Sequence, residues 1–300
     1  MKKVLILGKG YIGNYLYKTL LEKEVTYSKY KGQDIVVHFV SKADMDYTNR
    51  TTLLMHLSDN HYDLVINCSG FTGTPNIDEC ETKRFETYKL NVITPVMVTN
   101  LCARFGITFV HLSSGCIYNG YEKEWSEEDI PNFGIDNPQS SYYSFTKHCA
   151  EEHLKMMTNV DIFRLRMPFS ADVCNRNYIT KLRNYNRLLD ATNSRTCVED
   201  LCEFLYEYYF GSKGQRFYLP GQIFNIVNPN PLSTKDYMRI LKEFKLDNPN
   251  WVIAEEQDLN MAAKRSNCIL KSALDATPYE LPPEEESLIN VCKKIKGIAK

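Results

Sequence analysis

The 300-residue sequence predicts an α/β fold: a doubly wound parallel sheet with a smaller, mainly helical C-terminal lobe that binds the substrate. Two observations lead to this prediction. Over residues 1–167, short apolar runs alternate with helix-compatible segments, which is typical of parallel strands joined by crossover helices. Residues 229–300 lack this alternation and are helical, charged and interrupted by prolines. We therefore expect a sheet domain of residues 1–167 plus about 190–228, and a lobe of about 168–189 plus 229–300.

The composition of the chain argues against nucleic acid, a membrane or a metal ion as a partner. The 36 basic and 37 acidic side chains give a formal net charge of −1, so the chain has no field that would attract nucleic acid. No apolar run is long enough for a signal sequence or a membrane span, so we expect a cytoplasmic protein without membrane association. The ten cysteines are scattered and form no Cys-x-x-Cys pair, and the six histidines show no ligand spacing. We expect reduced thiols and no metal site.

The first strand and helix flank a glycine-rich loop. The apolar run Val4–Leu7 leads directly into Gly8, Gly10 and Gly13, spaced Gly-x-Gly-x-x-Gly, and a helical segment begins at about Ile12. Free N–H groups at the start of that helix would bind a pyrophosphate, and the glycines would let the backbone approach it. The order of strand, loop and helix therefore predicts a dinucleotide site. The candidate contacts are Gly8, Gly10, Tyr11, Ile12 and Gly13.

The next segment bears on which dinucleotide binds. We expect a short strand that ends near Tyr27, where an acidic residue would accept a hydrogen bond from the ribose 2′-hydroxyl of NAD. Ser28 and Lys29 follow instead. A hydroxyl and an ammonium group suit a 2′-phosphate, so this segment favours NADPH, with NADH as the other candidate. The second apolar run, Ile35–Val40, leaves the register open.

Small and polar residues follow the buried run of residues 63–67, as in a wall of the same cofactor crevice. The candidate cofactor contacts here are Cys68, Ser69 and Gly70. The turn-rich loop that comes next offers Thr72 and Asn76 to a substrate. The helix expected around residues 86–100 contains Pro95, which predicts a kink or a break.

Two segments predict a proton relay. The buried run Phe109–Leu112 opens into small polar residues that include Ser114, at the edge where a parallel sheet forms its ligand crevice. A helix over residues 142–157 would place Tyr143 and Lys147 at positions i and i+4, on one face. A lysine ammonium favours the phenolate of a tyrosine, whose unperturbed pKa is about 10, and a serine hydroxyl can bind the same reacting oxygen. Tyr-x-x-x-Lys alone occurs by chance on many helices, so its context carries the prediction.

The remaining segments complete the sheet and supply polar side chains. We expect an acidic, proline-bearing loop over residues 122–138 and a strand over residues 160–166. Residues 169–195 are rich in Asn, Arg and Tyr, a composition suited to a phosphorylated ligand. The candidate ligand contacts are Asn177, Lys181 and Arg183, with Arg265 further along the chain. A helix over residues 198–210 and a strand over 222–227 are expected to return to the main sheet.

Together these residues resemble the extended short-chain dehydrogenase/reductase family, whose fold is of the Rossmann type. The residues that carry this resemblance are Gly8, Gly10, Gly13, Ser114, Tyr143 and Lys147. More narrowly, the chain is similar to the bifunctional nucleotide-sugar 3,5-epimerase/4-reductases of UDP-rhamnose synthesis, which are related to the dTDP-4-dehydrorhamnose reductases. The matching segments are residues 72–76, 114–117, 164–168, 176–182, 224–229 and 264–267. The glycine loop departs from that family's Gly-x-x-Gly-x-x-Gly by being one residue shorter.

The resemblance implies conversion of UDP-4-keto-6-deoxyglucose to UDP-L-rhamnose, with NADPH as the hydride donor. Ser114, Tyr143 and Lys147 would serve reduction at C4, with the last two also contacting the cofactor. Cys116 and Lys181 would serve epimerisation at C3 and C5. Further implied contacts are Pro168 with the cofactor, and Thr72, Asn76, Asn177 and Arg265 with the nucleotide sugar. In the related 4,6-dehydratases two acidic residues follow the serine or threonine, and Gly115 and Cys116 replace them here, so dehydration is disfavoured.

Alternatives remain open at this level. One is a reductase of dTDP- or UDP-4-dehydrorhamnose without epimerase activity, and another is a non-catalytic NADP-binding regulatory subunit. The set of Ser114, Tyr143 and Lys147 argues against the regulatory subunit, because a binding module has no need of a proton relay. Cys116 can equally be a small buried thiol, and Lys181 a surface or phosphate-binding lysine. The sequence leaves a homodimer and the choice between UDP and dTDP open.

Overall fold

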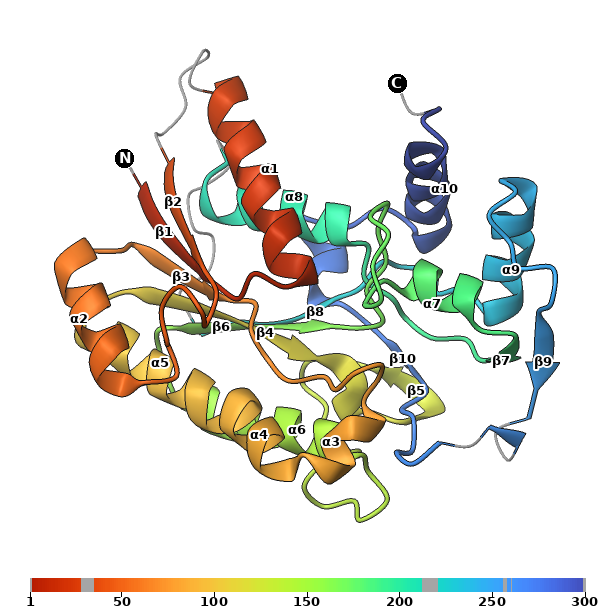
Figure 1. The fold of residues 1–300 in the computed structure, drawn as a ribbon, viewed down its shortest axis with the longest axis horizontal. Coiled ribbons are helices and arrows are strands. Elements are labelled where there is room, and N and C mark those ends of the chain that lie inside the picture. The colour runs from red at the N-terminus through yellow and green to blue at the C-terminus, as the bar shows by residue number, and fades with distance from the viewer. Residues whose placement is uncertain (1, 28–34, 212–220, 256–257, 260, 299–300) are drawn as a thin grey trace.

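A parallel sheet forms the centre of the molecule (Figure 1). The computed structural model describes residues 2–27, 35–211, 221–255, 258–259 and 261–298. Within these residues six strands run in the order β2-β1-β3-β4-β6-β8, and every neighbouring pair is parallel. The strands are β1 (Lys2–Leu7), β2 (Ile35–Val40), β3 (Leu64–Asn67), β4 (Thr108–Ser114), β6 (Val160–Leu165) and β8 (Ile223–Ile226). The predicted α/β class with a doubly wound parallel sheet is confirmed.

Helices cover both faces of this sheet, α1 and α8 on one face and α2, α5 and α6 on the other (Figure 1). Their bounds are α1 (Tyr11–Tyr27), α2 (Arg50–Asn60), α5 (Thr94–Arg104), α6 (Tyr142–Leu154) and α8 (Val198–Tyr209). In β1, Val4 and Ile6 belong to the first hydrophobic cluster and Leu5 and Leu7 to the second, because successive side chains of a strand point to opposite faces. A strand buried on both faces is therefore continuously apolar in sequence. In the described ranges, no helix is both long enough and apolar enough to cross a membrane.

The strand order reverses between β1 and β3, which sets where a ligand can bind. The chain leaves β1 for β2 on one side and then crosses to β3 on the other side. The loops that leave β1 and β3 therefore diverge and open a crevice at the carboxyl ends of these strands. Backbone hydrogen bonds hold the rim of this crevice: Gly8 N donates to Val40 O at 2.8 Å, and Cys68 N donates to Leu7 O at 2.9 Å.

The helix expected around residues 86–100 is broken, as Pro95 predicted. The structure has α4 (Arg84–Tyr88), a π-helical turn η1 (Lys89–Ile93) and then α5, which carries Pro95 in its first turn. Proline has no N–H to donate to the preceding turn, so the backbone widens there. The π turn buries Asn91 beneath the loop that follows β3.

The C-terminal half of the chain contributes a third hydrophobic cluster outside the sheet. Its elements are α7 (Tyr178–Asn184), β7 (Arg187–Leu189), α9 (Thr234–Glu243), β9 (Val252–Ala254) and α10 (Glu284–Ile295). Leu182, Leu241 and Leu288 represent its apolar core, and β7 pairs with β9. The exact division of the chain into two domains stays a prediction.

The acidic loop predicted over residues 122–138 is partly wrong. Gly120–Trp125 forms a strand, β5, which pairs in parallel with β10 (Cys268–Leu270). Gly120 N donates to Asn267 O at 2.8 Å, so a segment distant in the chain supplies the partner strand. The remaining elements are α3 (Asp78–Thr82), the 3₁₀ turn η2 (Gly115–Ile117) and the 3₁₀ turn η4 (Ala273–Ala276).

The short strand predicted to end near Tyr27 is also wrong, because α1 continues through Tyr27. The sequence of this segment has no glycine or proline after Gly13 to end the helix, and short apolar stretches are ambiguous between helix and strand. The second strand of the sheet is instead Ile35–Val40. Ser28 and Lys29 lie outside the described residues.

Candidate active site

The glycine loop after β1 is shaped for close backbone packing and for an anion. Gly8 has φ +104°, and a Cβ there would lie 2.9 Å from Ser69 N. A Cβ on Gly13 would overlap the Gly8 carbonyl oxygen, whereas a Cβ on Gly10 would meet nothing within 4 Å. Gly8 and Gly13 therefore let strand, loop and helix close on one another, and Gly10 leaves open space. The first N–H groups of α1, from Tyr11 onward, face this space without helical acceptors, which fits a pyrophosphate.

The wall of the crevice opposite the glycine loop comes from the end of β3. Ser69 donates through its backbone N and its Oγ to Asn67 Oδ1, which fixes the turn after the strand. A Cβ on Gly70 would lie 3.2 Å from Asn91 Oδ1 and 3.8 Å from Lys147 Nζ, so this glycine lets both side chains approach the backbone. Cys68 is half-buried beside Leu7. The structure thus brings the predicted segment 68–70 to the same edge as the glycine loop.

A further candidate segment for recognition of the adenosine ribose lies after the second strand. In this fold that position follows the second strand, and β2 ends at Val40. Ser41 donates to Asp44 Oδ2 through its backbone N and its Oγ, both at 2.7 Å, and Lys9 forms an ion pair with the same carboxylate at 2.9 Å. These hydrogen bonds hold the pKa of Asp44 well below its usual range. Ser41 and its neighbour Lys42 are therefore candidate ribose contacts beside Ser28 and Lys29, whose role stays a prediction because they lie outside the described residues.

Ser114, Tyr143 and Lys147 come together between β4 and α6. Ser114 is the last residue of β4, and its Oγ accepts a hydrogen bond from Cys116 N at 3.2 Å. Ser141 caps the N-terminus of α6, which places Tyr143 in its first turn next to Ser114, with which it shares a hydrogen bond. One turn later the buried Lys147 Nζ donates to the carbonyl of Leu112 at 3.2 Å. A substrate oxygen at this edge could contact a serine hydroxyl and a tyrosine phenol together.

Burial determines the protonation states of Tyr143 and Lys147. It raises the pKa of Tyr143 far above its usual value, an effect that the Cys116 charge reinforces and the hydrogen bond with Ser114 opposes. Tyr143 is therefore a neutral phenol with a proton to give. Burial also lowers the pKa of Lys147 to about 8, against the opposing charges of Glu151 and Cys116. The lysine ammonium and its neutral form are both accessible near neutral pH.

A buried ion pair that the sequence did not reveal fixes α6 against the sheet. Arg164 on β6 donates to Glu151 Oε2 through Nε at 2.9 Å and Nη2 at 2.8 Å, and Ser113 Oγ donates to Glu151 Oε1 at 2.5 Å. Glu151 lies one turn beyond Lys147 on α6. The ion pair therefore joins the helix of Tyr143 and Lys147 to β6, and the Ser113 hydrogen bond joins the same helix to β4, the strand that ends in Ser114. An i+4 glutamate on the apolar face of a predicted helix was the available sequence signal.

The structure also gathers Cys116 and Lys181. The half-buried Cys116 Sγ lies 3.7 Å from Arg166 Nη1, and Arg166 is itself buried. Lys181, in the middle of α7, has a pKa lowered by burial and by the charges of Arg176 and Arg265, with Cys116 among the groups that oppose this shift. Within the described residues the Lys181 ammonium has no hydrogen-bond or ion-pair partner. The Cys116 thiol and the Lys181 amine are therefore close enough to influence each other electrostatically.

Cationic side chains lie beside the loop of residues 72–76. Arg265 forms an ion pair with Asp78 at 2.7 Å, and Asn76 Oδ1 accepts from Asp78 N at 2.9 Å. Arg176, which the sequence argument did not single out, donates to Thr72 O at 3.4 Å. The predicted contacts Thr72, Asn76 and Arg265 thus lie in one region with Arg176 and Lys181, a cluster suited to a diphosphate.

Asn177 does not join this cluster as a free side chain, and its predicted role as a substrate contact stays a prediction. It is buried, its Oδ1 accepts from Ile179 N at 3.0 Å, and its Nδ2 donates to Ser170 O at 2.8 Å. This is an N-cap, the role in which asparagine is favoured at a helix start. Its contribution is to orient α7. Pro168 lies at the same junction, where its carbonyl accepts from Tyr178 N at 2.9 Å.

A glycine loop at a helix N-terminus, a strand-order reversal and a Ser-Tyr-Lys group at the same sheet edge define a dinucleotide-dependent oxidoreductase of the Rossmann type. Among the residues described, no three His, Cys, Asp or Glu side chains are grouped to hold a metal ion. The model of one family, the RmlD substrate-binding domain, matches residues 1–282. The chain belongs to this family.

Relatives of known activity support the assignment. The chain is 31% identical over 297 residues to the Arabidopsis thaliana bifunctional dTDP-4-dehydrorhamnose 3,5-epimerase/dTDP-4-dehydrorhamnose reductase, covering 95% of this chain and 90% of the relative. It is also 31% identical over 301 residues to the trifunctional Arabidopsis thaliana enzyme that is UDP-glucose 4,6-dehydratase, UDP-4-keto-6-deoxy-D-glucose 3,5-epimerase and UDP-4-keto-L-rhamnose reductase. That match covers 96% of this chain but only 41% of the trifunctional relative, so the chain spans about two fifths of its length.

The fold is shared with solved structures. The L780 UDP-rhamnose synthase of Acanthamoeba polyphaga mimivirus superposes with a TM-score of 0.81 at 25% identity, over 97% of this chain and 99% of that chain. Other structures of this fold are complexes with NADP or NADPH, at identities of 18% and 17% that show the fold alone.

Proposed function

We propose that this protein is an NADPH-dependent reductase of a nucleotide-linked 4-keto-6-deoxy sugar, of the UDP- or dTDP-4-dehydrorhamnose type. The observation that carries the proposal is the convergence of Ser114, Tyr143 and Lys147 at the edge of the sheet where the glycine loop opens. Family membership and the reductase names of the relatives support it. They favour the reductase, which the sequence argument held as its alternative, over the bifunctional enzyme.

In this proposal the chain's own residues bind the sugar ketone and deliver its proton. Ser114 Oγ and the Tyr143 phenol donate to the C4 carbonyl oxygen, where negative charge develops during reduction. Tyr143 then gives its proton to the new alkoxide, which is a stronger base than a phenolate. Burial raises the pKa of Tyr143 and so keeps this proton in place until the alkoxide forms. The ammonium of Lys147, one turn further along α6, would stabilise the phenolate left behind. NADPH supplies the hydride when bound.

The cofactor would be held by groups on three segments. The N-terminus of α1 and the space at Gly10 suit the pyrophosphate, and the segment 68–70 lines the crevice beside it. Ser41 and Lys42, after β2, offer a hydroxyl and an ammonium to a 2′-phosphate. Asp44 is engaged by Ser41 and Lys9, so it is less available to a 2′-hydroxyl, which favours NADPH over NADH.

The first test supplies an already epimerised substrate. UDP-4-dehydrorhamnose and dTDP-4-dehydrorhamnose should each be tried with NADPH, and oxidation of NADPH should be followed by its absorbance. Tyr143→Phe should lower kcat by roughly 10²–10⁴-fold because the general acid is lost, while NADPH binding stays unchanged. Normal turnover by Tyr143→Phe, or tight NADPH binding with no turnover of either sugar by the wild type, would contradict the proposal. The second result would favour a regulatory subunit.

A second function, epimerisation at C3 and C5, is favoured by the placement of Cys116 near Tyr143 and of Lys181 near Cys116. In a 4-keto sugar the C4 carbonyl acidifies the hydrogens at C3 and C5, so inversion needs a base and an acid flanking the ring. Cys116 and the unpartnered ammonium of Lys181 supply such groups from two different elements, η2 and α7. The plant relative of which the chain covers 90% carries both activities in its name.

Heavy water separates the two functions. With UDP-4-keto-6-deoxyglucose and NADPH in D₂O, an epimerase-reductase should place deuterium at both C3 and C5 of the product, as seen by NMR. Cys116→Ala and Lys181→Ala should each abolish this labelling and still reduce UDP-4-dehydrorhamnose. Reduction without label at C3 or C5 in the wild-type product would leave a C4 reductase alone.

A further inference from the structure

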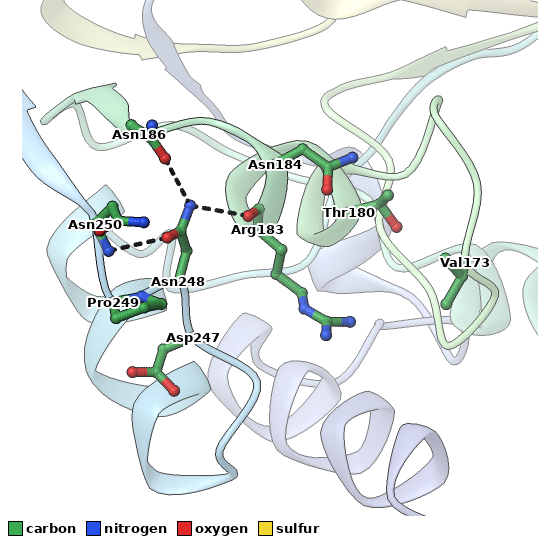
Figure 2. A pocket seen from close by; sticks show the side chains of 9 residues that line it. All are labelled: Val173, Thr180, Arg183, Asn184, Asn186, Asp247, Asn248, Pro249 and Asn250. Carbon is green, nitrogen blue, oxygen red and sulfur yellow. Dashed lines mark hydrogen bonds between the residues drawn. The ribbon is translucent and has the colours of Figure 1, made fainter.

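A cavity beside α7 is lined by none of Ser114, Tyr143 and Lys147. It has a volume of about 430 Å³ and is bounded by the carboxyl half of α7, by Val173 and by the segment 247–250 (Figure 2). Neither Cys116 nor Lys181 lines it. Its size is near the lower end of the range for small-molecule sites, about 300–1,000 Å³, so it suits a monosaccharide phosphate better than a dinucleotide.

The lining of this cavity is polar and contains charges that have no partner. Thr180, Arg183 and Asn184 lie at positions i, i+3 and i+4 of α7 and so share one face of the helix. In Figure 2 the Arg183 side chain extends from α7 into the space between Val173 and the segment 247–250. Among the described residues, neither the Arg183 guanidinium nor the Asp247 carboxylate takes part in a hydrogen bond or ion pair, although both line the same cavity.

The walls of the cavity are held in place by hydrogen bonds that do not use these groups. Asn248 Nδ2 donates to Arg183 O at 3.1 Å and to Asn186 Oδ1 at 3.0 Å, and Asn248 Oδ1 accepts from Asn250 N at 2.9 Å (Figure 2). Just beyond, Trp251 Nε1 donates to Leu182 O at 2.7 Å. The segment 247–250 is therefore fixed against α7 before any ligand arrives. A preformed site loses less binding free energy to ordering.

We propose that this cavity binds a phosphorylated sugar, at a site separate from the catalytic one. The planar guanidinium of Arg183 matches a phosphate group, which accepts two parallel hydrogen bonds from it. Asp247 accepts hydrogen bonds from sugar hydroxyls on the other side of the cavity. The Asn184 and Asn250 amides can donate to and accept from further hydroxyls. A cation and an anion that face one cavity without pairing suit a ligand that carries both an anion and hydrogen-bond donors.

The test is a calorimetric titration of the full-length protein with glucose 1-phosphate, in the presence of saturating UDP and NADP⁺ to fill the catalytic crevice. Binding with a Kd below about 1 mM is expected to persist under these conditions. Arg183→Gln should weaken it about tenfold or more, because a charge-assisted contact is lost. Arg187→Gln is the matched control, since Arg187 is an exposed arginine on β7 that does not line the cavity. A thermal melt confirms that each variant is folded.

Two further measurements test the sugar contacts and the phosphate contacts separately. Asp247→Asn should weaken glucose 1-phosphate several-fold and leave inorganic phosphate unchanged, because only the sugar contacts this carboxylate. Competition by UDP, equal binding of inorganic phosphate and glucose 1-phosphate, or equal loss in Arg183→Gln and Arg187→Gln would each overturn the proposal. The outcome is independent of the proposed reductase activity, because no turnover is measured.

Discussion

At the scale of single residues, burial determines which groups in the site can exchange protons. Tyr143 keeps its phenolic proton because burial raises its pKa, whereas the same burial lowers the pKa of Lys147 to about 8. Both groups are therefore protonated at neutral pH, Tyr143 as a phenol and Lys147 mainly as an ammonium. This arrangement favours reduction, in which a proton must be given, and makes the rate sensitive to the charge of Lys147.

The first prediction concerns this pH dependence. Because Lys147 is charged below its pKa of about 8 and loses its proton above it, kcat/KM for reduction should be high at neutral pH and fall as the pH rises through about 8. Rates measured from pH 6 to about 10 would show this limb. In Lys147→Arg the guanidinium stays charged, so the limb should move to higher pH even if the absolute rate is lower. A fall of kcat/KM at the same pH in Lys147→Arg as in the wild type would show that another group causes it.

The second prediction compares two glycines of the cofactor loop. Gly13→Ala places a Cβ on the Gly8 carbonyl and should both lower the thermal midpoint and abolish NADPH binding. Gly10→Ala meets no protein atom within 4 Å, so its thermal midpoint should stay nearly that of the wild type while NADPH binding weakens. Thermal melts and fluorescence titration with NADPH measure the two effects. Normal NADPH affinity in Gly10→Ala would place the pyrophosphate elsewhere.

At the scale of secondary structure, α6 depends on the ion pair of Glu151 with Arg164. Both side chains are almost fully buried, 3% and 4% exposed, so removing one leaves the other charge unpaired in the interior. Neutral replacement of one partner in such a pair typically costs about 3–5 kcal/mol. The same helix carries Glu152, whose ion pair with Lys155 lies in solvent.

The third prediction uses these adjacent glutamates. Glu151→Gln should lower the free energy of unfolding in urea by about 3–5 kcal/mol and also slow reduction, because α6 carries both Tyr143 and Lys147. Glu152→Gln, one residue away, should change stability by no more than about 1 kcal/mol and leave the rate unchanged. Equal effects of the two substitutions would show that the buried pair has no special part in positioning α6.

At the scale of the whole molecule, local patterns were predictable and long-range partners were not. The parallel sheet, the glycine loop and the group of Ser114, Tyr143 and Lys147 follow from apolar runs, helical spacing and small residues at strand ends. Such patterns report on neighbours a few positions apart. They gave no sign of the pairing of β5 with β10, and they placed a strand end near Tyr27, where α1 continues.

For the site residues too, local spacing was predictable from the sequence, whereas contacts between distant segments were not. Arg164, the buried partner of Glu151, lies on β6, and Arg176 approaches Thr72 from a loop distant in the sequence. Both contacts arise only when the chain folds. Asn177 was noticed because polar residues crowd its segment, but its fully bonded N-cap is a local structural role. A polar residue at a helix start fits both a cap and a ligand contact, and the sequence does not distinguish the two.

The contacts of Arg166 with the β10 segment also determine when the site is completed during synthesis. Arg166 donates to both Oγ and the backbone carbonyl of Ser266, which lies 100 residues further along the chain. At roughly 5–20 residues per second, a ribosome needs about 5–20 s to extend from one to the other. During that interval the glycine loop and Tyr143 have already been made, while the arginine beside Cys116 still lacks its two hydrogen bonds with Ser266. The residues of the cofactor crevice are therefore synthesised before the last contacts beside Cys116 can form.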